Sequence, residues 1–290
     1  MTPTAGQAAG SGPSGGSGPS GSGMSPRSVV SPWARADPLL AVAHGSRDPQ
    51  AAATTADLLD RVRRRATRHG LADLQVATAY LGHAAPSPSQ ALGALRGAGA
   101  HRIVVLPLLL TAAYHSKTDI PAVLRTAHAA LPGLQIRCAP PLGPHPLLIK
   151  AMERRLVQAN VRPGDPRTAV VLAAAGSTDP AATEVIYQLA RDWQLRRGWQ
   201  VAPAFASAAS PTPAEAVSRL RRAGARRIAV ATYLLAPGVF ADLVRDTSLA
   251  AGATTVSAVL GDAPELADLI LRHYAAASAG LPRTVPARTA

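Results

Sequence analysis

The chain has 290 residues, of which 47% are hydrophobic and 16% charged, so it is long enough for two ordinary domains with buried cores. Its single cysteine, Cys138, excludes a disulfide framework and a Cys-x-x-Cys metal site. The formal net charge of +13 favours an anionic partner, which could be a nucleic acid, a membrane surface or a ligand with several carboxylates.

The two ends of the chain have the composition of flexible tails. Residues 1–36 are rich in Gly, Ser and Pro and contain no apolar region of the kind found in a signal peptide. We expect this segment and residues 278–290 to form no packed structure. No run of 18 apolar residues occurs elsewhere, so the sequence predicts a soluble, cytoplasmic protein without a membrane-spanning helix.

Between the tails, short apolar runs alternate with amphipathic segments. About eight helices are expected, among them 49–69 and 180–197, each opened by an Asp as N-cap and a Pro at the first helical position. This rhythm predicts an α/β fold with mainly parallel four-stranded sheets flanked by helices. The expected strands are 39–43, 74–80, 102–107, 134–138, 169–174, 200–205, 227–233 and 254–258.

The second half of the sequence repeats the first. AHGSRDPQAA at Ala43 aligns with AAGSTDPAAT at Ala174, and LRGAGAHRIVV at Leu95 aligns with LRRAGARRIAV at Leu220. A third match pairs LPLLLTAAYH at Leu106 with ATYLLAPGVF. Three matches in the same order predict two homologous tandem domains, residues 37–160 and 169–277, joined near residues 160–168.

The repeat separates residues that the fold needs from residues that it does not. Gly, Ser, Asp and Pro of the first motif recur in both copies, as expected for a turn and a helix cap. His44, however, is matched by Ala175, and His115 is matched by Phe240. The two histidines are therefore candidates for chemistry.

Both histidines are expected near the carboxyl ends of parallel strands, where open sheets of this kind bind their ligands. His44 follows the strand at 39–43, and His115 lies just beyond the strand at 102–107. Neutral imidazole binds divalent iron, cobalt, nickel and zinc, and it also takes up a proton near neutral pH. A metal ligand and a base are thus predicted in one cleft.

The paired motifs AHGSRDP and PLLLTAAYHSKTDIP, with the degenerate AAGSTDP and YLLAPGVFADLV, resemble those of the sirohydrochlorin chelatases, the small class II chelatases. The resemblance covers about residues 38–275. It implies two tandem chelatase-like domains and a lyase that inserts Fe²⁺ or Co²⁺ into sirohydrochlorin for sirohaem or cobalamin biosynthesis. Its partners would be the divalent metal and an anionic tetrapyrrole, with no nucleic acid, no membrane and no permanently bound cofactor.

The resemblance also implies roles for single residues. His44 and His115 would bind the metal and help to remove the pyrrole protons. We expect Ser46, Arg47 and Lys117, which lie close to these histidines in sequence, to contact the substrate and its carboxylates. The alternative is that Arg47 and Lys117 are ordinary surface cations that face solvent and do not contact the substrate.

One position departs from the family pattern. Many relatives have an acidic residue after the second strand, where this chain has Gly82. His83 could take over part of that role or be a loop histidine without function, and Asp119 could supply a carboxylate. The third metal ligand therefore stays open. So does the choice among iron, cobalt and nickel, because histidine binds all three.

Three other functions compete with metal insertion. A tetrapyrrole or metal carrier would share the cleft and the histidines without accelerating insertion. A nucleic-acid-binding protein would need a clustered basic face, whereas the arginines here are spread over separate helical segments and favour solvated helix faces. A nucleotide-binding enzyme of the dinucleotide type would carry a GxGxxG after a strand, and none is present.

Overall fold

The computed structural model describes residues 36–111 and 120–279. Both expected tails fall almost entirely outside this range, and so do His115, Lys117 and Asp119. In the described part of the chain, no helix is long and apolar enough to cross a membrane.

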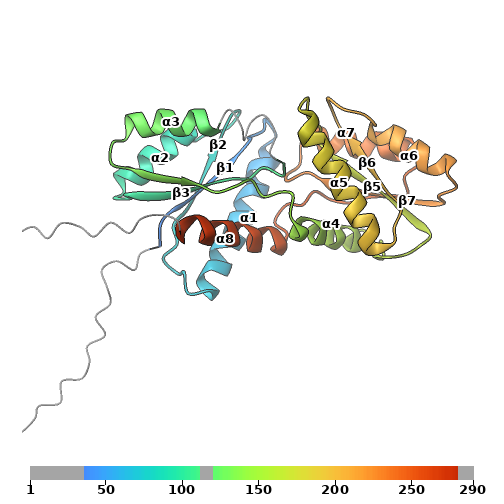
Figure 1. Ribbon diagram of the computed structural model, residues 1–290, viewed down its shortest axis with the longest axis horizontal. Helices are drawn as coiled ribbons and strands as arrows, with labels where there is room; N and C mark the ends of the chain where they lie inside the picture. The colour runs from blue at the N-terminus through green and yellow to red at the C-terminus, as the bar shows by residue number, and fades with distance from the viewer. Residues whose placement is uncertain (1–35, 112–119, 280–290) are drawn as a thin grey trace, which may run out of the picture. The chain divides into compact units, whose positions relative to one another are not determined.

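The first half forms a four-stranded parallel sheet in the order β2-β1-β3-β4. Helices α2 and α3 cover one face of this sheet, and α1 lies on the other (Figure 1). The elements are β1 (Leu39–Ala43), α1 (Pro49–Arg68), β2 (Val76–Tyr80), α2 (Pro88–Gly97), β3 (Arg102–Pro107), α3 (Ile120–Ala130), β4 (Gln135–Cys138) and α4 (Pro146–Gln158).

The second half repeats this topology, with the strand order β6-β5-β7-β8 and all strands parallel. Helices α6 and α7 pack together on one face of the sheet, and α5 lies on the other. The elements are β5 (Thr168–Ala174), α5 (Pro180–Arg197), β6 (Val201–Phe205), α6 (Pro213–Arg222), β7 (Arg227–Tyr233), α7 (Val239–Ala250), β8 (Thr255–Val256) and α8 (Pro264–Ala279).

The predicted α/β fold with two parallel four-stranded sheets is confirmed. Three strands, β1, β3 and β7, begin and end where the apolar runs predict. The largest difference is in β8, which is limited to Thr255–Val256 because it pairs at the sheet edge with only two residues of β7. Edge strands need fewer ladder hydrogen bonds than central ones, so a short edge strand is tolerated.

The helix starts show why the duplicated turns keep their polar residues. The Asp48 carboxylate accepts a hydrogen bond from the backbone N–H of Gln50 at 2.8 Å, and Asp179 does the same for Ala181 at 2.9 Å. Ser46 and Ser177 each accept a hydrogen bond, 3.0 Å long, from the backbone N–H of the following Asp. These contacts satisfy helix N–H groups that would otherwise have no partner.

The last helix of each half packs on the other half. Helix α4 lies against β7 of the second sheet, and α8 lies against α1 and β3 of the first (Figure 1). As a result one continuous core runs through both halves, from Leu39 to Ala277. The division into domains at 37–160 and 169–277 stays a proposal, since it follows the sequence repeat while the packing exchanges two helices.

Ion pairs strengthen this exchange. Arg61 of α1 pairs with Asp262 just before α8, and Arg65 pairs with Asp268 at 2.6 Å. Arg154 of α4 forms a bidentate pair with Glu265, with its closest contact at 2.7 Å. The expectation of solvated arginine faces is therefore wrong for Arg61 and Arg65.

Candidate functional site

A pocket of about 560 Å³ lies at the carboxyl ends of the strands of the first sheet, within the usual size range for small-molecule sites. The first half contributes the loop after β1, the loop after β2 and Leu108 after β3. The second half contributes a single segment, Leu234–Ala241, which joins β7 to α7. The pocket therefore lies where the sequence places the ligand crevice.

His44 lies in this pocket as the first residue after β1, and its side chain is exposed. Its backbone carbonyl accepts a hydrogen bond from Gly82 at 3.0 Å, which ties the loop after β1 to the loop after β2. Gly45 has φ +90°, and a Cβ there would come 1.8 Å from the Gly82 carbonyl oxygen. Only glycine fits this turn, so the turn fixes the direction in which His44 leaves the strand.

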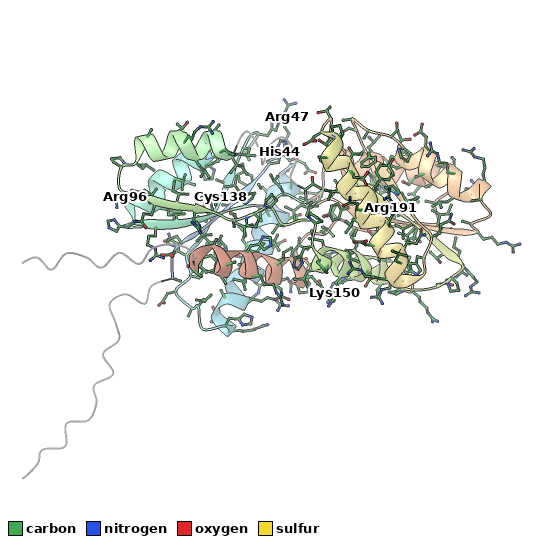
Figure 2. All side chains as sticks on the ribbon, viewed as in Figure 1. His44, Arg47, Arg96, Cys138, Lys150 and Arg191 are labelled. Carbon is green, nitrogen blue, oxygen red and sulfur yellow. The ribbon has the colours of Figure 1, made fainter. Side chains whose placement is uncertain are left out.

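Ser46 and Arg47 also line the pocket. The hydroxyl of Ser46 accepts the N–H of Asp48, and Ser177 makes the same bond in the second half, so this contact belongs to the turn. Arg47 is exposed, and Figure 2 shows it beside His44 at one end of the first half, with Arg96 at the other end. Its guanidinium is therefore within the same site as the imidazole.

Two further residues come from the end of β2. Tyr80 is paired in register with Ala43, and burial raises the pKa of its phenol. His83 lies on the pocket with its backbone at φ 62°, and the equivalent Ala208 of the second half has φ 57°. Because alanine adopts the same strained conformation, the loop imposes it and the histidine side chain is not its cause.

Leu108, Leu109 and Leu110, which precede His115 in the sequence, each form a hydrogen bond to another part of the described chain. Leu108 donates its N–H to Val42 at 2.8 Å, and the carbonyl of Leu109 accepts from Leu142 at 2.8 Å. The hydroxyl of Tyr233, in the second half, donates to the Leu110 carbonyl at 2.9 Å. His115 and Lys117 lie outside the described residues, so their roles stay predictions.

Among the predicted site residues, the structure brings His44, Ser46 and Arg47 together in one pocket. The sequence did not single out Tyr80 as a pocket residue, and within the run Leu234–Ala241 it pointed only to Phe240. Tyr80 is the last residue of its strand, and the strand-end rule that points to His44 applies to it as well. The run in the second half includes Phe240, the counterpart of His115, so the sequence repeat could have been used to predict that this run reaches the pocket.

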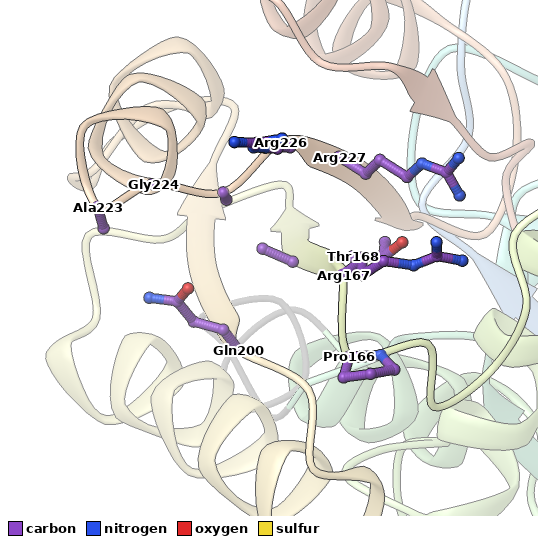
Figure 3. A pocket seen from close by; sticks show the side chains of 10 residues that line it. Pro166, Arg167, Thr168, Gln200, Ala223, Gly224, Arg226 and Arg227 are labelled. Carbon is purple, nitrogen blue, oxygen red and sulfur yellow. The ribbon is translucent and has the colours of Figure 1, made fainter.

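Another pocket, of about 540 Å³, lies at the amino ends of the second sheet, beside Arg167, Gln200, Arg226 and Arg227 (Figure 3). Arg167 and Arg227 both contact the carboxylate of Asp165, at 3.3 and 3.6 Å. Their charges are thus partly compensated within the protein. This second pocket has no histidine in its lining and lies at the amino ends of the strands, whereas open parallel sheets bind ligands at the carboxyl ends. We therefore do not assign metal binding or proton transfer to it.

Two other histidines, His145 and His273, have structural partners. His145 caps α4, because its Nδ1 accepts the N–H of Leu147 at 3.1 Å, and His273 contacts the carbonyl of Pro140 at 3.3 Å. Burial lowers the pKa of both side chains, which keeps the capping nitrogen of His145 available as an acceptor. Among the described residues, no group of three or more His, Cys, Asp or Glu is placed to hold a metal ion.

Two parallel sheets in tandem, with a histidine in a pocket at the strand ends of the first, define an α/β protein with a candidate ligand site at those strand ends. The chain belongs to the CbiX family, which matches residues 38–159 and again 169–277. The two matched segments correspond to the two halves of the structure.

The relatives with similar sequences are chelatases. The chain is 30% identical over 205 residues to a sirohydrochlorin cobaltochelatase from Priestia megaterium, covering 69% of this chain and 65% of that protein. It thus spans slightly less than two thirds of that relative's length. It is 27% identical to a sirohydrochlorin ferrochelatase from the same organism, over 72% of this chain and 77% of the relative.

A solved structure confirms the fold. SirB from Bacillus subtilis with Fe³⁺ superposes with a TM-score of 0.72, at 24% sequence identity, over 84% of this chain and 96% of that one.

Proposed function

We propose that the chain is a sirohydrochlorin chelatase, a lyase that inserts Fe²⁺ or Co²⁺ into sirohydrochlorin for sirohaem or cobalamin biosynthesis. The observation that carries the proposal is His44 in the strand-end pocket, at a position that the second half fills with Ala175. Membership of the CbiX family and the names of the cobalt- and iron-inserting relatives support it.

The reaction needs a ligand for the metal and an acceptor for protons. Metal insertion replaces two pyrrole N–H protons by one divalent ion, so the ring releases two protons and the metal loses bound water. A neutral imidazole at His44 can bind the incoming ion and can also accept a proton. We assign the same two roles to His115, whose position follows from the sequence alone.

The proposed substrate carries several carboxylates, which the charge of the site favours. Arg47 lies beside His44, and the chain as a whole is strongly basic. Contacts of Arg47, Ser46 and Lys117 with these carboxylates would hold the ring while its nitrogens face the metal. We further propose a cytoplasmic location, the divalent metal as substrate, no permanently bound cofactor, and no nucleic-acid or membrane partner.

The test is the absorbance change of metal-free sirohydrochlorin on adding Co²⁺ or Fe²⁺ without oxygen, corrected for spontaneous insertion. The proposal expects the purified chain to accelerate insertion of at least one metal in a catalytic amount. Stoichiometric binding of the tetrapyrrole with no acceleration would favour a carrier. Running Fe²⁺, Co²⁺ and Ni²⁺ side by side would identify the preferred metal, which imidazole ligands alone do not select.

A further inference from the structure

The two halves line the pocket with different chemistry. The described polar side chains of the lining, among them His44, Arg47 and His83, all come from the first half. The second half contributes only Leu234–Ala241, with the sequence LLAPGVFA, in which every side chain is apolar or absent. We call this segment the apolar wall.

The apolar wall lies directly on the loop that carries His44. A Cβ placed on Gly238 would come 3.5 Å from the hydroxyl oxygen of Ser46. Gly238 has φ +141°, and together with Pro237 it leads into the first turn of α7. The polar and apolar sides of the pocket therefore meet at Gly238 and Ser46.

The apolar side chains on the first turn of α7 are unusually open to solvent. Val239 is 81% exposed and Phe240 is 45% exposed. Leu243, one helical turn further along, is 40% exposed and extends the same strip. Large apolar groups that gather at a pocket rim mark a surface that is covered when a ligand binds.

The repeat shows that this composition is specific to the second copy. The first copy has Thr111, Tyr114, His115 and Ser116 at the positions of Ala236, Val239, Phe240 and Ala241. Four residue types with hydrogen-bonding groups are thus replaced by four without them. Since the fold accepts either set, the apolar set has a role in the pocket that the sheet itself does not require.

We infer that the apolar wall, with Phe240 and Val239 at its centre, is the surface against which one flat face of the tetrapyrrole lies. This inference rests on the proposed function. The opposite, polar side of the pocket then faces the ring nitrogens with the His44 imidazole, while the carboxylates at the ring edge remain near Arg47. The second half is therefore a positioning element that orients the substrate and binds no metal.

The test measures binding of metal-free sirohydrochlorin by its fluorescence, without oxygen, to the full chain and to Phe240→Ser. We expect the Kd to rise about tenfold or more, where tenfold equals about 1.4 kcal/mol. Phe240→Leu should bind with intermediate affinity, because it keeps an apolar contact but not the ring. The affinity for Co²⁺ alone and the thermal midpoint should stay close to those of the wild type, because Phe240 is half exposed.

Leu249→Ser is the matched control, since Leu249 is a 46% exposed residue on the same helix that does not line the pocket. An unchanged Kd in Phe240→Ser would overturn the inference while leaving the proposed function intact. An equal loss in Leu249→Ser would also overturn it, because the effect would then belong to the helix as a whole. A wild-type chain that binds no sirohydrochlorin would overturn both proposals.

Discussion

Gly45 lies so close to Gly82 that a Cβ on Gly45 would come 1.8 Å from the Gly82 carbonyl oxygen. The second half repeats this approach at Gly176, where a Cβ would come 1.9 Å from the carbonyl oxygen of Ser207. Both glycines have φ near +90°, a conformation that side-chain-bearing residues rarely adopt. The chain thus contains the same glycine-dependent turn twice, once with His44 before it and once with Ala175.

This pair separates the stability of the turn from its function. Gly45→Ala and Gly176→Ala should each lower the free energy of unfolding by more than about 1 kcal/mol, because both introduce the same clash at positive φ. Only Gly45→Ala should also reduce the insertion rate, since it displaces the loop that carries His44. Chemical denaturation and the insertion assay measure the two effects. Equal loss of activity in both variants would contradict a special role for the first turn.

His44→Ala should leave the fold intact and reduce turnover by about 10² or more, the usual scale for losing a positioned acid–base group. The second half already has Ala175 at this place after a buried strand, so the scaffold tolerates the change. Insertion of Co²⁺ and the thermal midpoint are the measurements. His101→Ala, at the opposite ends of the strands, is the control and should keep its activity.

Several elements of the fold followed directly from the sequence. Apolar runs located β1, β3 and β7 to the residue, because central parallel strands are buried on both faces and read as continuous apolar segments. The Asp-Pro pairs located the starts of α1 and α5 because their caps are local contacts. The repeat predicted two sheets because both copies carry the same turns.

Long-range packing did not follow from the sequence. The exchange of α4 and α8 depends on which sheet each amphipathic helix covers. The apolar pattern of a helix shows which face is buried but not which sheet that face packs against. The pairing of Arg65 with Asp268 depends on this exchange and was missed for the same reason. In the site, the strand-end rule found His44, and closeness to His44 in the sequence found Arg47. The repeat pointed to Phe240 alone in the apolar wall, because the other residues of this segment have no charged or metal-binding group.

Glu153 is a further position where truncation should be costly. This residue of α4 is only 8% exposed, and its carboxylate accepts hydrogen bonds from Trp193 at 3.0 Å and from Arg197 at 2.6 and 2.7 Å. Glu153→Ala should lower the free energy of unfolding by about 1–3 kcal/mol, because the buried indole N–H loses its partner. Glu184→Ala, which removes an exposed pair with Arg191, should cost less than about 0.5 kcal/mol. Urea unfolding of both variants tests the difference.

Asp262 links the stability of the exchanged helices to pH. Hydrogen bonds from Arg61 and then Arg155 hold the pKa of its carboxyl below the ordinary value. A carboxyl whose pKa is lower in the folded than in the unfolded chain stabilises the fold above about pH 4, and this contribution is lost as the pH falls through the folded pKa. The thermal midpoint of the wild type should therefore fall between pH 5 and pH 3, as scanning calorimetry would measure.

Asp262→Asn should start from a lower midpoint at pH 7 and show a smaller fall over the same acidic range, because it has no proton to take up. Asp57→Asn, an exposed position on α1, should follow the wild-type curve. If Asp262→Asn lost as much stability in acid as the wild type, the acid sensitivity would have to come from other carboxyl groups.

Tyr233 connects the second sheet to the segment that precedes His115 by sequence. Its hydroxyl donates to the Leu110 carbonyl at 2.9 Å, and burial raises the pKa of the phenol so far that the group stays protonated and able to donate across the working range of pH. Tyr233→Phe leaves that carbonyl without this donor and should cost about 1 kcal/mol of stability. It should also raise the metal concentration needed for half-maximal insertion, because the segment leading to His115 is held less firmly.

Tyr187→Phe is the matched control, because it removes a similar hydroxyl-to-carbonyl bond, to Ser210 at 3.1 Å, away from the first sheet. This variant should leave the metal dependence unchanged. Metal titrations of the insertion rate compare the two variants, and identical titration curves for Tyr233→Phe and the wild type would remove Tyr233 from the support of the metal site.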